Sequence, residues 1–458
     1  MNMIKKGYHS LVEVFFVSKK NTIIIGTLVL TAAGFISRFM GFFYRIFLSR
    51  VFGEEGVGLY QLIFPVYALG YSLTTAGIET AISRTVARKM SLGKEQEARG
   101  ILSCGLVISF LLACLCALFL QKNTAYIATV LLGDERCAPL LSILSYSLPC
   151  CAIHSCICGY YYGLKQTKIP ALAQLVEQTF RICSVALLYY VITRNGEAVS
   201  IHIAVCGLVA GEFVSALFTL QALPGKKRPF APFRALRAFP ARTAELLRLS
   251  LPLTANRVLI NLLQSIEAVS IPGKLQCFNG NPPEALRVYG VLNGMALPCV
   301  LFPSAVTNAV SVMLLPTVAE IQAADNRREM LSIIKKVAGS CFILGLFCCL
   351  VFLLLGPFIG LTLFDSKMAG QFIVTLAWIC PFLYTNSAFL SIINGLGKTA
   401  QTFLINTLGL GIRIAGVFLA IPRFGIQGYL WGLLASQLFI SLLAGTTILR
   451  TVSGSLSR

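Results

Sequence analysis

The sequence predicts an all-α polytopic membrane protein, in which about twelve transmembrane helices form two parallel six-helix lobes. Composition is the first observation behind this fold class. Of 458 residues, 56% are hydrophobic and only 12% are charged, whereas soluble globular proteins carry about 25% charged residues. Segment length is the second observation, because the apolar stretches have about the twenty residues that a ~30 Å hydrocarbon core requires. The third is an internal repeat.

The expected helices follow one another closely, and the apolar stretches leave no room for a large soluble domain. The first helix begins after the basic pair Lys19-Lys20 and runs without charge from Asn21 to Ser37. A basic stretch at 225–242 separates the sixth helix from the seventh. The twelve expected helices cover residues 22–46, 57–83, 99–120, 137–163, 170–193, 201–221, 246–271, 288–316, 331–355, 370–395, 400–421 and 425–449.

The distribution of basic residues predicts the topology. Of the 38 lysines and arginines, 25 fall in the N-terminus, the even-numbered loops and the C-terminus, and eight fall in the odd-numbered loops. Because cytoplasmic loops carry the excess of Lys and Arg, both termini are expected in the cytoplasm. The net charge of +20 is therefore a topology signal and indicates no nucleic-acid partner. The remaining arginines lie inside helices and are Arg38, Arg45, Arg181, Arg257 and Arg413.

An internal repeat relates the two halves of the chain at an offset of 232 residues. The offset spans six helices, an even number, so both halves should cross the membrane in the same direction, related by an axis along the membrane normal. The expected lobes are residues 1–221 and 246–458, joined by a basic cytoplasmic linker at 222–245. Matching positions are TVA 85–87 with 317–319, Pro149 with Pro381, Gly163-Leu164 with Gly395-Leu396, Thr167 with Thr399, and Arg181-Ile182 with Arg413-Ile414.

Three intramembrane arginines, Arg38, Arg45 and Arg257, have no acidic residue one helical turn away. A charge near the bilayer centre costs ~2.5–3.5 kcal/mol on insertion scales, so such residues mark functional pathways. A guanidinium is a permanently charged planar fork suited to phosphate. These arginines are therefore expected to line a cationic cavity and bind an anionic substrate, together with Asn261 on the polar stripe of the seventh helix. Snorkelling to the membrane surface is the alternative, and it is most serious for Arg45.

Glu177 and Arg181 are four residues apart, the spacing and order in which a helix pairs them best, and are predicted to form a structural pair. Arg413 is the repeat counterpart of Arg181, but Gly409 occupies the position of the acid. Arg413 is therefore expected to be freer to bind substrate.

Two further acids have a predicted role. Glu79 in the second helix and Glu267 in the seventh are expected to bind a coupling cation or to balance the arginines, since an empty cavity with uncompensated charge is costly. Glu212 in the sixth helix and His154 in the fourth receive no firm role.

Nothing in the sequence indicates an enzyme. There is no nucleotide-binding loop and no nucleophile–base constellation. The sixteen cysteines lie almost entirely in apolar segments, where they are expected to act as small packing residues. None forms a CxxC pair with zinc-finger spacing. No catalytic residue, metal site or cofactor is predicted.

The stretch at 37–89, which begins SRFMGFFYRIFLSRVFGEEGVGLYQLIFPVY, resembles the start of the polysaccharide-flippase branch of the MOP superfamily, and particularly its stage V sporulation protein B-like members. The stretches 159–182 and 424–437 are similar to later signatures of that family. The resemblance implies a MATE-like, two-lobed, alternating-access flippase for polyprenyl-pyrophosphate-linked saccharides, either a peptidoglycan precursor or a surface polysaccharide repeat unit. It also implies a monomer among the lipids of a bacterial-type plasma membrane, with coupling to Na⁺, H⁺ or the membrane potential left open.

The pattern of Ser37, Arg38, Gly41 and Arg45 also resembles the first helix of MurJ-type lipid II flippases, whose arginines there line the cavity. Two features depart from these relatives. They commonly have fourteen helices, and MurJ-type members place an arginine in the eighth, whereas 289–316 contains no basic residue.

Two alternatives remain from the sequence. A cation-coupled multidrug exporter of the related MATE type would need acids in its cavity, and Glu79 and Glu267 could serve, but unpaired arginines fit a cationic cargo badly. A scaffold or receptor without transport activity is the third reading.

Overall fold

The computed structural model describes residues 2–223, 239–323 and 327–454, and all regular structure in these ranges is helical. The predicted basic linker at 222–245 lies largely outside the described residues. The first half contains α1 (Asn2–Leu62), α2 (Phe64–Tyr71), the π-helical η1 (Ser72–Ala76), α3 (Gly77–Ser91), α4 (Glu95–Lys122), α5 (Thr124–Tyr126), η2 (Ile127–Leu132), α6 (Cys137–Ser145), α7 (Ser147–Gly163), α8 (Lys168–Arg194) and α9 (His202–Ala222).

The second half begins with the 41-residue helix α10. Its elements are α10 (Phe239–Asn279), α11 (Pro282–Gly290), the π-helical η4 (Val291–Ala296), α12 (Leu297–Leu301), α13 (Ser304–Ala323), α14 (Arg327–Phe364), α15 (Lys367–Ala377), α16 (Cys380–Gly395), α17 (Thr399–Ala415), η5 (Gly416–Ala420), α18 (Ile421–Phe424) and α19 (Ile426–Gly454).

Eight helical segments among the described residues are long and apolar enough to cross a membrane, or eleven when each of three bent helix pairs counts as one span. One of these, Leu28–Ser91, has 64 residues, which is about 96 Å of helix against a ~30 Å hydrocarbon core. Gly53, with φ of 67°, interrupts it. Two crossings therefore fit within this segment, and the segments then correspond one to one with the twelve expected helices.

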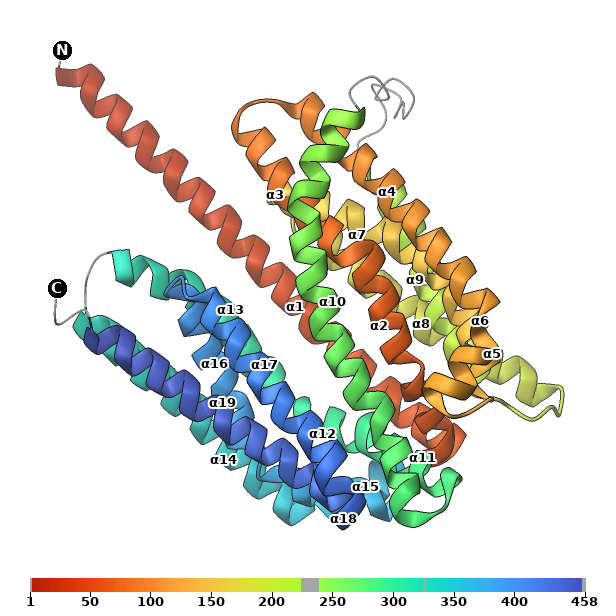
Figure 1. Cartoon of the computed structure of the whole chain (residues 1–458). Coiled ribbons are helices and arrows are strands. Elements are labelled where there is room, and N and C mark those ends of the chain that lie inside the picture. Colours follow the sequence, from red (N-terminus) through yellow and green to blue (C-terminus); the bar gives the residue numbers. More distant parts are fainter. Residues whose placement is uncertain (1, 224–238, 324–326, 455–458) are drawn as a thin grey trace.

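The helices form two bundles that converge near α11, α15 and α18 and diverge towards the end where both termini lie (Figure 1). We call these the closed end and the open end. At the open end each bundle has its own buried core, one formed by α3, α4 and α7 with part of α10, the other by α13, α14, α16, α17 and α19. At the closed end one continuous core contains residues of both bundles. The closed end is therefore where apolar packing holds the bundles together.

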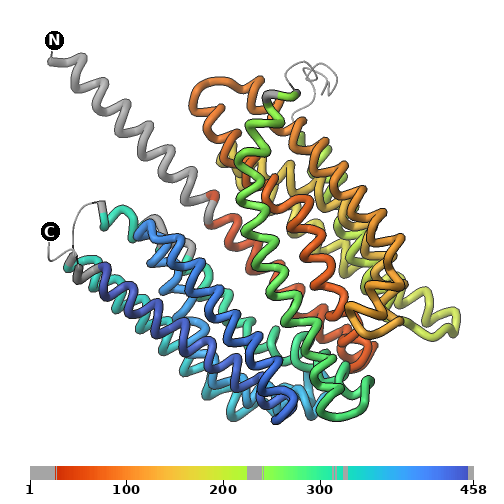
Figure 2. Tube along the Cα trace, in the orientation of Figure 1, coloured from red at the N-terminus to blue at the C-terminus, as the bar shows by residue number. Residues whose placement is uncertain are grey.

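Helix α10 contacts both bundles. Thr254 lies against Gly77 of α3, and Asn261 and Ser265 bond to the backbone of α2. Further along, Glu267 reaches α17 and α19. The trace in Figure 2 shows α10, in green, running beside the first bundle and ending at the closed end. The expected lobe boundary at 246 stays a prediction. It falls within α10, which runs from Phe239 to Asn279.

Two helix breaks recur at the repeat offset. The pair α6 and α7 bends by 40° and the pair α15 and α16 by 56°. A proline ring clashes with the carbonyl four residues earlier and cannot donate a hydrogen bond. Counting back four from Pro149 and from Pro381 gives Ser145 and Ala377, which are the last residues of α6 and α15. The matched prolines therefore account for both bends.

Two repeat-related glycines meet at the closed end. A side chain on Gly290 would collide with the backbone of Gly58 and with the Glu54 carbonyl, and one on Gly58 would collide with the Leu286 carbonyl. Gly58 matches Gly290 and Glu54 matches Leu286 at the offset of 232, so the contact is reciprocal. Such a contact is what a local twofold axis between α1 and α11 produces.

Candidate functional site

A polar face of α1 lines a cavity of about 630 Å³. Arg38, Gly41 and Arg45 follow one another at three- and four-residue spacing, which places them on one side of α1. Gln178 and Arg181 of α8 form the adjacent wall, and residues 293–308, from η4 to α13, form the opposite one. Helices of both halves of the chain therefore build the cavity.

Among the described residues, three arginines line the cavity, and no aspartate or glutamate does. Arg38 is exposed, and Arg45 donates from Nη1 to the Asn293 carbonyl oxygen over 3.4 Å. Neither has a carboxylate within ion-pair distance in the described part of the chain. Because neither guanidinium charge is compensated by a carboxylate, the site favours an anion.

Arg181 was expected only as a structural partner of Glu177, and the structure contains that ion pair within α8. Arg181 also donates from Nη1 to Gln178 over 3.3 Å, while its Nε is buried without a hydrogen-bond partner in the described residues. The Nδ2 of Asn293, on the opposite wall, is likewise without a partner. A buried donor left unpaired costs ~1–3 kcal/mol, so both groups are suited to meet acceptor oxygens of a ligand. The sequence feature that could have marked Arg181 as more than a structural residue is its repeat match with Arg413.

Arg257 and Asn261 do not line this cavity. Arg257 is exposed and donates from Nη2 to Thr80 Oγ1 over 3.5 Å, and Asn261 donates to the Ala68 carbonyl oxygen over 3.3 Å. Both contacts follow from the packing of this part of α10 against α2 and α3. Their predicted role in substrate binding stays a prediction.

Arg413 was expected to be freer to bind substrate because Gly409 occupies the position of the acid, but it has an acidic partner from another helix, and its role in substrate binding stays a prediction. Its Nε donates to Glu267 Oε1 over 2.8 Å, and the same oxygen accepts a 2.8 Å hydrogen bond from Tyr429. Glu267 is only 3% exposed. The carboxylate that Gly409 cannot supply comes from α10, a helix distant in sequence. In this structure Glu267 therefore balances Arg413.

Glu79 lies in α3 and is half-buried, and its Oε2 accepts a 3.0 Å hydrogen bond from the Tyr71 hydroxyl. No lysine or arginine lies within ion-pair distance of Glu79 in the described residues. Its predicted part in coupling stays a prediction.

Sequence reasoning missed a polar network at the closed end, which we call the closed-end network. Glu54 of α1 accepts hydrogen bonds from Arg287, at 2.8 and 3.2 Å, and from the Ser366 hydroxyl. Arg50 donates to the Leu363 carbonyl oxygen over 3.0 Å, and Ser49 to that of Phe364 over 2.8 Å. These bonds join α1 to segments of the second half. The acidic pair Glu54-Glu55 in an otherwise apolar region was the available signal.

A neighbouring ion-pair group stays within the first half. Arg136 donates to Asp134 and, over 2.7 Å, to Glu55. Hydrogen bonds to Asp134, and then to Glu55, raise the pKa of Arg136 above its ordinary value.

The fold is that of a polytopic membrane protein whose two helical bundles meet at one end. The chain belongs to the polysaccharide biosynthesis protein family, whose model matches residues 23–322. Among curated proteins it is 26% identical to stage V sporulation protein B of Bacillus subtilis (strain 168), covering 94% of this chain and 84% of that protein. It is 23% identical to lipid II flippase MurJ of the same organism, over 94% and 82%. These matches place the chain among transporters and not among enzymes.

Solved structures show the same fold. An inward closed conformation of the lipid II flippase MurJ matches with a TM-score of 0.73 at 14% identity, over 92% of this chain and 87% of that one. An inward-facing multidrug resistance MATE family transporter of the MOP superfamily matches with a TM-score of 0.70 at 14% identity, over 93% and 98%. The predicted fold class and superfamily are confirmed.

Proposed function

We propose that this protein is an alternating-access flippase that exports polyprenyl-pyrophosphate-linked saccharides, and that its arginine-lined cavity binds the anionic headgroup. The observation that carries the proposal is the combination of Arg38, Arg45 and Arg181 around one cavity without an acidic lining residue. A diphosphate supplies negative charge and pairs of acceptor oxygens, which planar guanidinium groups bind in a bidentate manner.

The size of the cavity and the relatives support the same cargo. About 630 Å³ lies within the range of small-ligand sites, and it accommodates a diphosphate with part of a sugar. Membership of a polysaccharide biosynthesis family fits a saccharide cargo, and one curated relative is a lipid II flippase. Another is a sporulation protein, so a peptidoglycan precursor or a surface polysaccharide repeat unit is the proposed saccharide.

The charge distribution supports an orientation in a bacterial-type plasma membrane with both termini in the cytoplasm. In that orientation the open end faces the cytoplasm, the closed end faces outward, and this structure is the inward-facing state. We propose a monomer in which transport is coupled to Na⁺ or H⁺ bound at Glu79 or Glu267, or is driven by the membrane potential.

The multidrug-exporter alternative has the fold in its favour but not the site. A cationic drug in the cavity would meet three arginines and no lining carboxylate, which raises its free energy of binding. In a drug exporter, Glu267→Gln would abolish resistance to cationic dyes and leave lipid-linked sugar export unchanged. We expect the reverse.

The test is flipping of a polyprenyl-diphosphate-linked saccharide by the full chain in lipid vesicles, measured as loss of accessible headgroup from one leaflet. A charge-assisted contact contributes roughly 1.5–3 kcal/mol, so Arg38→Ala and Arg45→Ala should each weaken headgroup binding roughly tenfold to a hundredfold. Lysine at either position should rescue in part, because it keeps the charge and loses the fork. Arg423→Ala, an exposed arginine outside the cavity, is the matched control. Normal flipping by both alanine variants would refute the proposal.

A further inference from the structure

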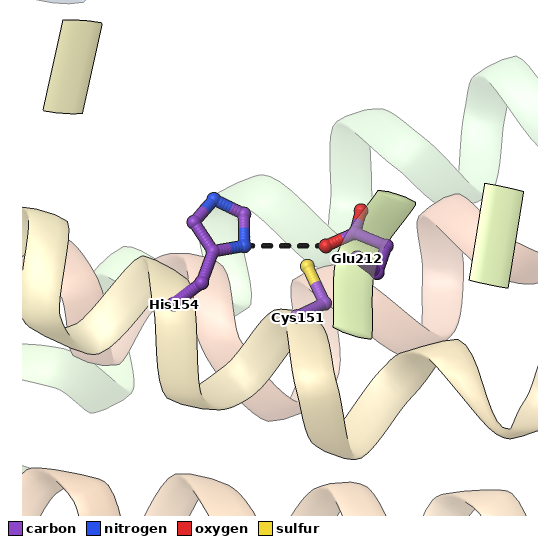
Figure 3. Close-up of side chains that lie close together, drawn as sticks. All are labelled: Cys151, His154 and Glu212. Carbon is purple, nitrogen blue, oxygen red and sulfur yellow. Dashed lines mark hydrogen bonds and ion pairs between the residues drawn. The ribbon is translucent and has the colours of Figure 1, made fainter. Parts of the chain in front are cut away.

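A buried cluster inside the first bundle has no part in the proposed transport site. Cys151 and His154 lie three residues apart on α7, so both side chains project from one face, and Glu212 projects towards them from α9. One ligand atom from each, the thiol sulfur, an imidazole nitrogen and a carboxylate oxygen, lies within 4.8 Å of the other two. Figure 3 shows the three side chains directed towards one another.

We propose that Cys151, His154 and Glu212 form a binding site for a divalent transition metal of the zinc class. Zn²⁺ takes sulfur at ~2.3 Å and nitrogen or oxygen at ~2.0–2.2 Å, which places tetrahedral ligand atoms roughly 3.3–3.6 Å apart. His154 Nδ1 and Glu212 Oε2 are already 3.2 Å apart. The Cys151 sulfur, which lies within 4.8 Å of both other ligand atoms, would supply the third of four tetrahedral positions.

The donor set selects the class of metal. Mg²⁺ and Ca²⁺ prefer oxygen ligands, so a thiol and an imidazole disfavour both. Zn²⁺ and Co²⁺ bind thiolate, imidazole and carboxylate together. Charge leads to the same class, because a divalent ion with the Cys151 thiolate, the Glu212 carboxylate and neutral His154 is electrically neutral as a group. A neutral group avoids the cost of a lone buried ion, and the thiol proton is released when the metal binds.

The surroundings hold the carboxylate in place. The Tyr67 hydroxyl of α2 donates to Glu212 Oε1 over 3.0 Å, which leaves Oε2 directed to His154. Groups that orient metal ligands in this way raise affinity. Glu212 and Cys151 are 5% and 4% exposed, whereas the His154 side chain is 16% exposed. His154 is thus the most accessible of the three.

A metal here would fasten α7 to α9 and, through Tyr67, hold α2. Helix α2 is the segment to which Ser265 of α10 bonds through the Pro65 carbonyl oxygen, at 3.2 Å. Helix α2 therefore links the site to α10, the helix that contacts both bundles. The sequence contains the signal as Cys-x-x-His at 151–154, which a search for CxxC pairs passes over.

The experiment is metal titration of the purified full chain in detergent, stripped with a chelator. Co²⁺ serves as the spectroscopic probe, because its thiolate charge-transfer band reports a cysteine ligand, and Zn²⁺ competition gives the affinity. We expect one equivalent bound by the wild type and at least roughly tenfold weaker binding in Cys151→Ser and His154→Ala, since loss of even an outer-shell partner costs 10–100-fold. The thiolate band should disappear in Cys151→Ser.

Cys150→Ser is the matched control, because this neighbouring, less buried cysteine lies outside the cluster. It should bind as the wild type does. Thermal unfolding of each variant checks folding, and added Zn²⁺ should raise the unfolding temperature of the wild type and of Cys150→Ser but not that of Cys151→Ser. Absence of stoichiometric binding in the wild type would mean that His154 and Glu212 form only a hydrogen-bonded pair. That result, or unchanged affinity in Cys151→Ser, overturns the proposal.

Discussion

At the residue scale, the two repeat-related arginines have different surroundings although both are paired. Arg181 receives its carboxylate from Glu177 on its own helix and lines the cavity. Arg413 receives its carboxylate from Glu267 on α10 and does not line it. The Glu177–Arg181 pair can therefore be used to test anion binding in the cavity, with the Glu267–Arg413 pair as the control.

We predict that inorganic diphosphate stabilises Glu177→Gln more than it stabilises the wild type. Removing one partner of this partly buried pair leaves an uncompensated charge, which costs less than the ~3–5 kcal/mol of a fully buried pair, and an anion in the cavity would offset part of that cost. The measurement is the unfolding temperature in detergent with and without diphosphate. Glu267→Gln should be destabilised without any added response to diphosphate, because Arg413 lies away from the cavity. Equal responses in the two variants would contradict the cavity assignment of Arg181.

How much of the site the sequence predicts depends on where the partners lie. Arg38 and Arg45 share a cavity because one helix sets their spacing, and the Glu177–Arg181 pair is local for the same reason. The Arg413–Glu267 pair joins positions 146 residues apart, and helical periodicity carries no information about which helices pack together. The polar stripe of the seventh helix was visible in the sequence, but its direction depends on the packing of α10 against α2 and α3.

At the element scale, α8 and α9 pack through glycines that hold the Glu177–Arg181 pair in place. A Cβ on Gly211 would lie 2.7 Å from the Glu177 carbonyl oxygen and 3.2 Å from Arg181 Cβ. Small residues of this kind let membrane helices approach closely. The helix bends at Pro149 and Pro381 also have a local cause. Helix positions depend on such local features and were predictable from the sequence, whereas contacts between helices depend on residues far apart in the chain and were not.

We predict that Gly211→Ala destabilises the protein by ~1–3 kcal/mol, because overpacking forces the backbones of α8 and α9 apart. Gly411→Ala on α17 is the matched control, since nothing lies within 4 Å of the added methyl group. That variant should be neutral or more stable by ~0.5–1 kcal/mol through helix propensity. Reversible unfolding in mixed micelles gives both values. If Gly211→Ala is as stable as Gly411→Ala, the close approach of α8 and α9 is not limiting.

At the scale of the whole molecule, one end is held by a shared core and by the closed-end network, while the other has two separate cores. The proposed alternating-access transport requires the two bundles to separate at the closed end. Glu54, whose side chain is 16% exposed, accepts bonds from Arg287 and Ser366 of the second half. The network therefore stabilises this structure relative to a state in which the closed end has opened.

We predict that Arg287→Ala raises the population open at the closed end about fivefold, since a partly exposed ion pair contributes up to about 1 kcal/mol. Spin labels at the exposed positions Glu135 and Lys367, which belong to different halves of the chain, would report the separation by pulsed electron resonance. Arg136→Ala removes two ion pairs that lie within the first half, to Glu55 and to Asp134, and should leave the distance distribution unchanged. An identical distribution in Arg287→Ala and Arg136→Ala would show that the network does not set this equilibrium.

The contact between Gly58 and Gly290 also carries a historical consequence. A residue that touches its own counterpart occupies the place of the twofold axis in a homodimer, so this contact has the form of a subunit interface made intramolecular by duplication and fusion of a half-length gene. In such a homodimer one residue would have to fit against its own image, and glycine meets that demand on both sides. After fusion the copies diverge independently. The ion pairs of Arg181 and Arg413, one closed within a helix and one supplied by α10, are where that divergence is now visible.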